Sequence, residues 1–115
     1  MSNKSNPVRD KSYQFSLEII KFCRKLINRK EFVIGKQLLK SGTSVGANIE
    51  EAQQAQSKKD FVSKLSISLK EASETRYWLM LIRDSNLAQK NEVNLLLQKI
   101  AELIRLLVSI IKSSK

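Results

Sequence analysis

The sequence predicts an all-α fold, an antiparallel up-down-up-down four-helix bundle. The chain has 115 residues, enough for one compact domain and too few for two. It contains one proline and three glycines, so most of the turn signals of an all-β or α/β protein are missing. Apolar residues make up 42% of the chain and recur at steps of three and four in four successive segments, as core-facing helices require.

The first helix is expected to begin at Ser12, whose side chain can cap it. Residues 1–11 are then a flexible N-terminal tail, and residues 12–115 form the bundle domain. The core-facing stripe of this helix is Phe15, Ile19, Phe22 and Leu26. A turn is predicted at residues 28–30.

The second helix is expected from about residue 31 to about residue 56. Its middle, residues 41–47, consists almost entirely of small side chains. Gly42 and Gly46 would each cost up to about 1 kcal/mol relative to alanine in a helix interior. Close approach of a neighbouring helix would offset that cost, and a loop or kink at this stretch is the alternative.

The third helix is expected to start at Ser57, because Ser57 and Asp60 have the spacing of a capping box. It ends near Asp84, and the fourth helix begins near Gln89. The fourth helix carries more apolar residues than one core needs, and such a surplus indicates a partner helix or another subunit. The surplus residues are Leu95, Leu103, Val108 and Ile110. Short connections make consecutive helices antiparallel neighbours.

Composition excludes several kinds of chemistry. The chain has no histidine, so imidazole bases, Ser-His-Asp and Cys-His nucleophiles and His-ligated zinc are ruled out. It has a single cysteine, Cys23, so an intramolecular disulfide and a cysteine-built metal site are ruled out as well. We therefore expect no catalytic residues, no metal site and no cofactor. The N-terminal residues lack the apolar core of a signal peptide, and no run approaches the ~20 apolar residues of a membrane span. The expected location is the cytoplasm, with no membrane partner.

The net charge of +10, from 21 basic and 11 acidic residues, favours a polyanionic partner such as nucleic acid. The charge is uneven, since residues 1–30 hold eight basic and two acidic residues. The candidate nucleic-acid contacts are Lys21, Arg24, Lys25, Arg29 and Lys30 on the first helix and its turn, with Lys58 and Lys59 as a second cluster. A solvated helix face would look the same. Because Tyr and Trp do not interleave with these residues, contact with a backbone or duplex shape is favoured over base stacking.

Polar residues adjoin the inner stripes of the second and third helices. They are Ser44, Asn48 and Glu51 on the second helix, and Lys70, Glu74 and Trp78 on the third. We expect a hydrogen-bonded structural network that sets helix register, in which Asn48 and Glu51 bond Lys70. The alternative is a catalytic carboxylate pair or a divalent-metal site built from Glu51 and Glu74.

Three segments closely resemble the "four helix bundle protein" family, also called the 23S rRNA intervening-sequence protein family. They read QLLKSGTSVGANIEEA at residues 37–52, SKKDF at 57–61 and LKEASETRYWL at 69–79. The likeness runs from about Tyr13 to the C-terminus, and Ser68 stands where the family more often has alanine. The resemblance implies a left-handed bundle that assembles into a ring of five subunits, with no enzymatic activity. A bundle related to this family is the accessory protein of diversity-generating retroelements, which binds nucleic acid and a reverse transcriptase.

The expected function is that of a non-catalytic homo-oligomer, a pentamer by the resemblance, that binds ribosomal or other structured RNA through its basic surface. The alternative is a protein-interaction scaffold or accessory subunit, for example of a reverse transcriptase, that does not recognise RNA directly.

Overall fold

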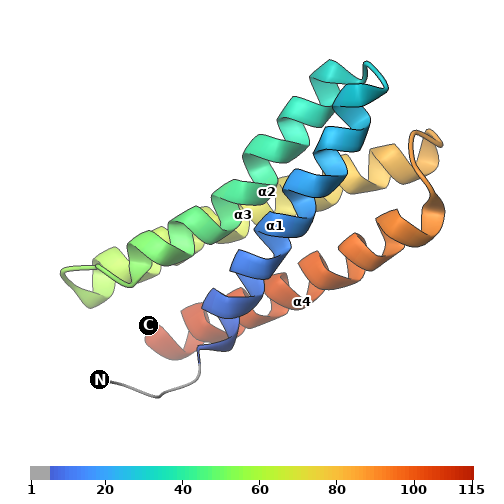
Figure 1. The fold of residues 1–115 in the computed structure, drawn as a ribbon. Coiled ribbons are helices and arrows are strands. Elements are labelled where there is room, and N and C mark those ends of the chain that lie inside the picture. The colour runs from blue at the N-terminus through green and yellow to red at the C-terminus, as the bar shows by residue number, and fades with distance from the viewer. Residues whose placement is uncertain (1–5) are drawn as a thin grey trace.

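The computed structural model describes residues 6–115 and shows four helices connected by short turns. They are α1 (Pro7–Asn28), α2 (Phe32–Ala52), α3 (Lys58–Asp84) and α4 (Lys90–Ser114). Each helix packs against the next along the chain, and α4 closes the bundle against α1 (Figure 1). The predicted all-α, up-down four-helix bundle is confirmed.

The start of α1 differs from the prediction. The helix begins at Pro7, so residues 7–11 are helical and not part of a tail, while residues 1–5 lie outside the described part of the chain. The cap is Asn6, whose side-chain oxygen accepts a hydrogen bond from the Arg9 backbone N–H at 3.2 Å. Proline suits the first helical position because its missing N–H would have no partner there. Ser12, the predicted cap, lies within the helix and is buried from solvent.

Turn geometry ends α1 and α3 in the same way. Lys30 and Asn86 have left-handed backbone conformations, with φ values of 69° and 59°. The N–H of the residue after each one bonds a carbonyl five residues back: Glu31 N–H to Leu26 O at 2.9 Å and Leu87 N–H to Ile82 O at 3.1 Å. Both are Schellman motifs, which satisfy the last carbonyls of a helix and reverse the chain.

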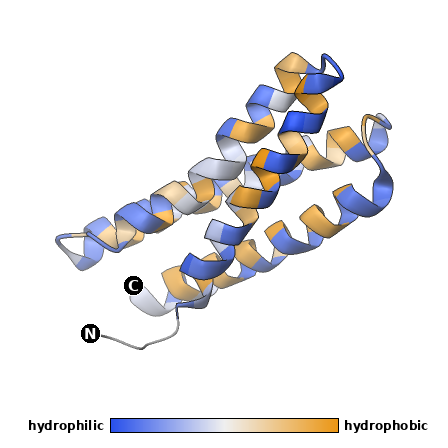
Figure 2. Ribbon diagram, viewed as in Figure 1, coloured by the Kyte–Doolittle hydropathy of each residue, from blue (hydrophilic) through white to orange (hydrophobic). Residues whose placement is uncertain are grey.

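The long small-residue stretch of α2 stays helical, so the alternative of a loop at residues 41–47 is wrong. This stretch appears pale in the hydropathy colouring of α2 (Figure 2). The helix ends earlier than predicted, at Ala52 and not near residue 56. The predicted start of α3 is confirmed: Ser57 Oγ accepts from the Asp60 backbone N–H at 3.0 Å. The reciprocal bond differs from that of a standard capping box, because Asp60 accepts from the backbone N–H of Gln56, the residue before the cap, at 3.3 Å.

The core consists of the predicted stripes, including Phe15, Ile19, Leu38 and Ile100, all with at most 1% exposure. One expectation for α4 is wrong. Leu103 belongs to the core, and Val108 and Ile110 are half-buried within this chain. Only Leu95 of the predicted surplus is exposed, at 56%. Unpartnered apolar surface therefore lies mainly on other helices.

Candidate nucleic-acid interface

The basic residues of α1 divide into two kinds. Lys21 and Arg24 lie exposed one turn apart, and no acidic side chain within residues 6–115 forms an ion pair with either. Lys25 instead pairs with Glu92 of α4 at 2.7 Å. Arg29 donates from Nη1 to the carbonyl oxygen of Leu87 at 2.9 Å, which ties the end of α1 to the loop before α4. Among the basic residues of α1, Lys21 and Arg24 are thus the ones best placed for an outside partner.

The second predicted basic cluster is far from the first. Lys58 and Lys59 occupy the first turn of α3, beside the C-terminal end of α4, where they line a recess of about 410 Å³ with Lys115. Lys30, in the α1–α2 turn, is at the other end of the bundle, whose longest dimension is 43 Å (Figure 1). The two clusters therefore do not form one continuous surface.

Three ion pairs connect α1 to α4. Lys11 pairs with Glu102 at 3.3 Å, Glu18 with Lys99 at 2.5 Å, and Lys25 with Glu92 at 2.7 Å. The three α1 residues are seven positions apart, two helical turns, so they recur on one side of the helix. We call this row the α1–α4 ion-pair row. It spans a contact in which α1 packs less closely than it does against α2.

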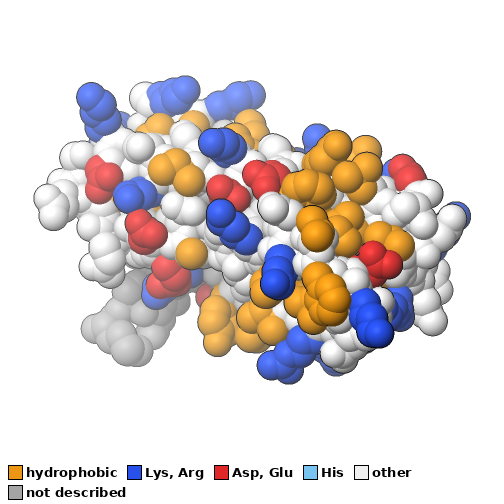
Figure 3. All heavy atoms as spheres, turned by 90° about the horizontal axis from the view of Figure 1, so that it is seen from above, with side chains coloured by type: hydrophobic (Ala, Val, Ile, Leu, Met, Phe, Trp, Pro, Cys, Tyr) orange, Lys and Arg blue, Asp and Glu red, His pale blue; other side chains and the backbone are white. Residues whose placement is uncertain are grey.

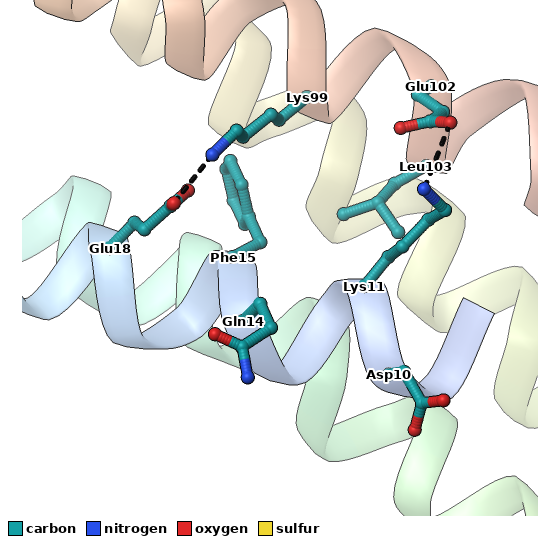
Figure 4. Close-up of a pocket in the computed structure, with 8 residues that line it drawn as sticks. All are labelled: Asp10, Lys11, Gln14, Phe15, Glu18, Lys99, Glu102 and Leu103. Carbon is teal, nitrogen blue, oxygen red and sulfur yellow. Dashed lines mark hydrogen bonds and ion pairs between the residues drawn. The ribbon is translucent and has the colours of Figure 1, made fainter. Parts of the chain in front are cut away.

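A pocket lies on each side of the Glu18–Lys99 pair. The first has a volume of about 260 Å³, with Phe15 and Leu103 between the charged residues. Figure 4 shows Lys99 reaching Glu18 and Lys11 reaching Glu102 across it, while Asp10 and Gln14 point away from α4. The second has a volume of about 210 Å³ and is lined by Glu18, Lys21, Phe22, Lys25, Glu92, Leu95, Leu96 and Lys99. Lys21 and Lys25 of the predicted basic stripe thus share a pocket with Lys99, which the sequence did not single out.

The predicted network between α2 and α3 is wrong in its central contact. Glu51 pairs with Lys64 at 3.0 Å and raises the pKa of that amine by hydrogen bonding, so it does not bond Lys70. Asn48 donates to the Ser44 carbonyl oxygen of its own helix at 2.8 Å. Lys70 is exposed and has no ion pair with any residue of the described chain. Neither expected bond to Lys70 is made, because Lys64 lies nearer the end of α2.

The other predicted members of the network bond within their own helices. The Ser44 hydroxyl donates to the Lys40 carbonyl oxygen at 2.6 Å. Trp78 Nε1 donates to Glu74 at 3.2 Å, so the four-residue spacing of this pair is realised. Because Glu51 and Glu74 have separate partners, they do not form a carboxylate pair. Within residues 6–115 no cluster of three or more Asp, Glu, Cys or His side chains could hold a metal ion.

Buried hydroxyls make the polar contacts between α2 and α3, and sequence reasoning missed them. Ser68 donates to the Val45 carbonyl oxygen at 2.8 Å. The hydroxyls of Thr75 and Ser41 lie 3.0 Å apart and are hydrogen-bonded to each other. All three side chains are fully buried. Their positions in the inner stripes, where the neighbours are apolar, were the available signal.

The α1–α2 apolar face is a set of exposed side chains on one side of the molecule. Its members are Tyr13, Leu17, Ile20 and Phe32. Phe32 lies five turns before Glu50 in α2, and Glu50 pairs with Arg9 of α1, so Phe32 faces the α1 side. Figure 3 shows hydrophobic side chains gathered toward one end of the molecule, with basic side chains around them.

The α3 apolar face is a second set, made of Val33, Ile67, Tyr77 and Leu81. Val33, 79% exposed, lies five turns before Glu51, which pairs with Lys64 of α3, so it faces the α3 side. The Tyr77 ring packs edge-on against Trp78 with centroids 5.3 Å apart. The two faces lie on different sides of α2.

Comparison with known proteins identifies close relatives. The model of the 23S rRNA-intervening sequence protein family matches residues 4–109. The chain is 48% identical in sequence to a protein of unknown function from the S23 ribosomal protein family of Bacteroides thetaiotaomicron VPI-5482. Its structure matches the crystal structure of that protein with a TM-score of 0.90. The match covers 91% of this chain and 98% of that one. No curated protein matches this chain. None of the helices between residues 6 and 115 combines the length and apolarity that a membrane crossing requires.

Proposed function

Because the chain belongs to the 23S rRNA-intervening sequence protein family, we propose that it is a non-catalytic homo-oligomer that binds structured RNA through the outer surface of α1. The observation that carries this proposal is the exposure of Lys21 and Arg24 without acidic partners among residues 6–115. Basic side chains not already neutralised within the protein can bind phosphates and release counterions. Their one-turn spacing suits neighbouring phosphates of a backbone.

The overall charge supports the same partner. Within residues 6–115, six of the 11 acidic residues are engaged in ion pairs, so these pairs neutralise only part of the 21 basic residues of the chain. The remaining positive charge would attract an RNA backbone over a distance of about 10 Å at moderate salt.

Self-association is supported by the α1–α2 and α3 apolar faces. A two-fold dimer uses one patch that meets its own copy, whereas two different patches that meet each other generate a ring when the rotation closes. A ring, with five subunits as the resemblance implies, repeats the α1 surface in every subunit. Weak contacts of single subunits with one RNA would then add through effective concentration.

The experiment measures binding to a fluorescent RNA hairpin by anisotropy between 50 and ~300 mM salt, a range over which phosphate contacts weaken strongly. We expect the double variant Lys21→Gln/Arg24→Gln to weaken binding. The negative slope of log K against log salt should become shallower by about 1.4–1.8, because two phosphate contacts are lost. The matched control is Lys70→Gln/Arg76→Gln, which removes two exposed charges from α3. Its effect should be smaller.

Two outcomes would overturn the proposal. One is undetectable RNA binding at the lowest salt. The other is an affinity that salt does not change. Recovery of one stoichiometric protein and no RNA in a pull-down from the native cell would favour the scaffold alternative.

A further inference from the structure

The second pocket beside the Glu18–Lys99 pair brings together lysines of two helices, which the α1 surface alone does not. Lys21 and Lys25 enter it from α1, and Lys99 enters from α4. Lys21 is the one lysine of the three without an ion pair among the described residues. An anion that binds Lys21 therefore breaks no existing contact, whereas Lys25 and Lys99 are already paired with Glu92 and Glu18.

Charge distinguishes this pocket from its neighbour. Three lysines and two glutamates line the second pocket, so its lining is net positive. Two lysines and three carboxylates line the first, so its lining is net negative. A ligand with a phosphate group is attracted to the second pocket and repelled by the first.

The floor of the second pocket is apolar. Leu95 of α4 is 56% exposed at its edge, while Leu96 and Phe22 are nearly buried beneath it. A flat ring system laid against these side chains would cover Leu95 and remove apolar area from water. The volume of about 210 Å³ is below the ~300–1,000 Å³ of pockets for drug-sized ligands, so one ring system fits better than a larger molecule.

One acceptor at the pocket lacks a donor. Glu18 Oε2 accepts from Lys99, but Glu18 Oε1 is buried and has no hydrogen-bond partner among the described residues. Buried polar atoms in folded proteins are almost always hydrogen-bonded to protein or to water, so this oxygen is available to accept from a donor that enters the pocket. Base amino groups are donors that carboxylates read, as in pairing of Glu with the cytosine N4 amino group.

We propose that this pocket binds one unpaired nucleotide of an RNA. The base packs on Leu95 and donates its amino group to Glu18, and the adjacent phosphate binds Lys21, the one lysine of the pocket without an ion pair among the described residues. This proposal rests on the proposed RNA-binding function and adds to it a preference for RNA with an unpaired base. Aromatic stacking is not needed, because the apolar contact comes from leucine side chains.

The test compares two RNA hairpins that differ only by one bulged cytidine in the stem, using the full chain. We expect the bulged hairpin to bind roughly three- to tenfold more tightly, where a tenfold difference in affinity corresponds to about 1.4 kcal/mol. Leu95→Ser removes the exposed floor without changing charge and should abolish this preference while leaving affinity for the fully paired hairpin unchanged. Met80→Ser, at an exposed apolar residue of α3, is the matched control and should keep the preference. Circular dichroism verifies that both variants fold.

The outcomes separate this inference from the proposed function. Equal binding of both hairpins, with no effect of Leu95→Ser, overturns the nucleotide pocket and leaves RNA binding intact. Failure to bind either hairpin overturns both. Free cytidine monophosphate binding as tightly as the bulged hairpin would overturn RNA as the occupant.

Discussion

Gly42 of α2 lies directly against Ile19 of α1, so that a Cβ built at Gly42 would be only 2.8 Å from Ile19 Cγ2. Ile19 is completely buried, so its side chain has no free space into which it can move. Gly46, one turn further on, meets the α1 backbone, with a Cβ there 3.3 Å from the Ser12 carbonyl oxygen. The small-residue stretch of α2 is therefore a close helix–helix contact, which offsets the helix propensity lost at these glycines.

Gly42→Ala should destabilise the fold despite the better helix propensity of alanine. The gain of about 1 kcal/mol in propensity is outweighed by overpacking of about 1–3 kcal/mol against Ile19. Urea unfolding followed by circular dichroism measures the difference. The control is Gly35→Ala, whose Cβ would meet mainly the half-buried Ile27 side chain at 3.1 Å. If Gly42→Ala is as stable as Gly35→Ala, the contact with Ile19 does not limit the size of the side chain at position 42.

Thr75→Val should lower the free energy of unfolding by about 1–2 kcal/mol, because it leaves the buried Ser41 hydroxyl without its interhelical partner. The double variant Ser41→Ala/Thr75→Val should lose less than the sum of the single variants, since both polar groups are then gone. Thr43→Val is the control, because Thr43 bonds only carbonyls of its own helix. Additive losses in the double variant would show that the two hydroxyls do not interact.

Lys30→Gly should stabilise the fold by about 0.5–1 kcal/mol, because glycine adopts the left-handed conformation at φ 69° without the steric cost that lysine bears. Lys36→Gly removes the same charge from the interior of α2 and should destabilise by about 1 kcal/mol. Thermal unfolding of the two variants gives the comparison. A loss of stability in Lys30→Gly would contradict the assigned turn.

Cys23 should make stability fall at high pH. Burial raises the pKa of its thiol from 9.0 to about 12. Between these values the unfolded chain loses the thiol proton and the folded chain keeps it, so the free energy of unfolding decreases as pH rises, by up to about 1.4 kcal/mol per pH unit. Urea unfolding at pH 8, 10 and 11 should give a steeper decline for the natural chain than for Cys23→Ala. Parallel declines would mean that the thiol ionises freely in the fold.

Leu17→Asp should disrupt self-association, because it places a charge in the centre of the α1–α2 apolar face, where desolvating an unpaired carboxylate is costly. Light scattering should then give a smaller mass than for the natural chain. Ser109→Asp introduces the same charge at an exposed position of α4 outside both faces and should leave the mass unchanged. A natural chain that is monomeric at all concentrations would remove the basis of this prediction.

The helices and their core stripes were predictable from the sequence, because the 3.6-residue period records on each segment which side is buried. The cap at Ser57 was also predictable, because the signal for a capping box lies within four consecutive residues. The start of α1 was missed although Asn6 followed by Pro7 is a recognisable cap and first-turn pair. The local signal for this start is present in the sequence, and Ser12 offers a competing cap residue further along the chain.

Contacts between helices could be decided only by the tertiary structure. Glu51 pairs with Lys64 and not Lys70, and Glu18 meets Lys99, which is 81 residues away along the chain. An apolar stripe determines which side of a helix is buried, but it leaves the rotation and axial position relative to neighbouring helices open by several ångströms. Ion pairs and hydrogen bonds act over about 3 Å, so their partners, and the pocket where Lys21 and Lys25 meet Lys99, follow only from how the four helices pack.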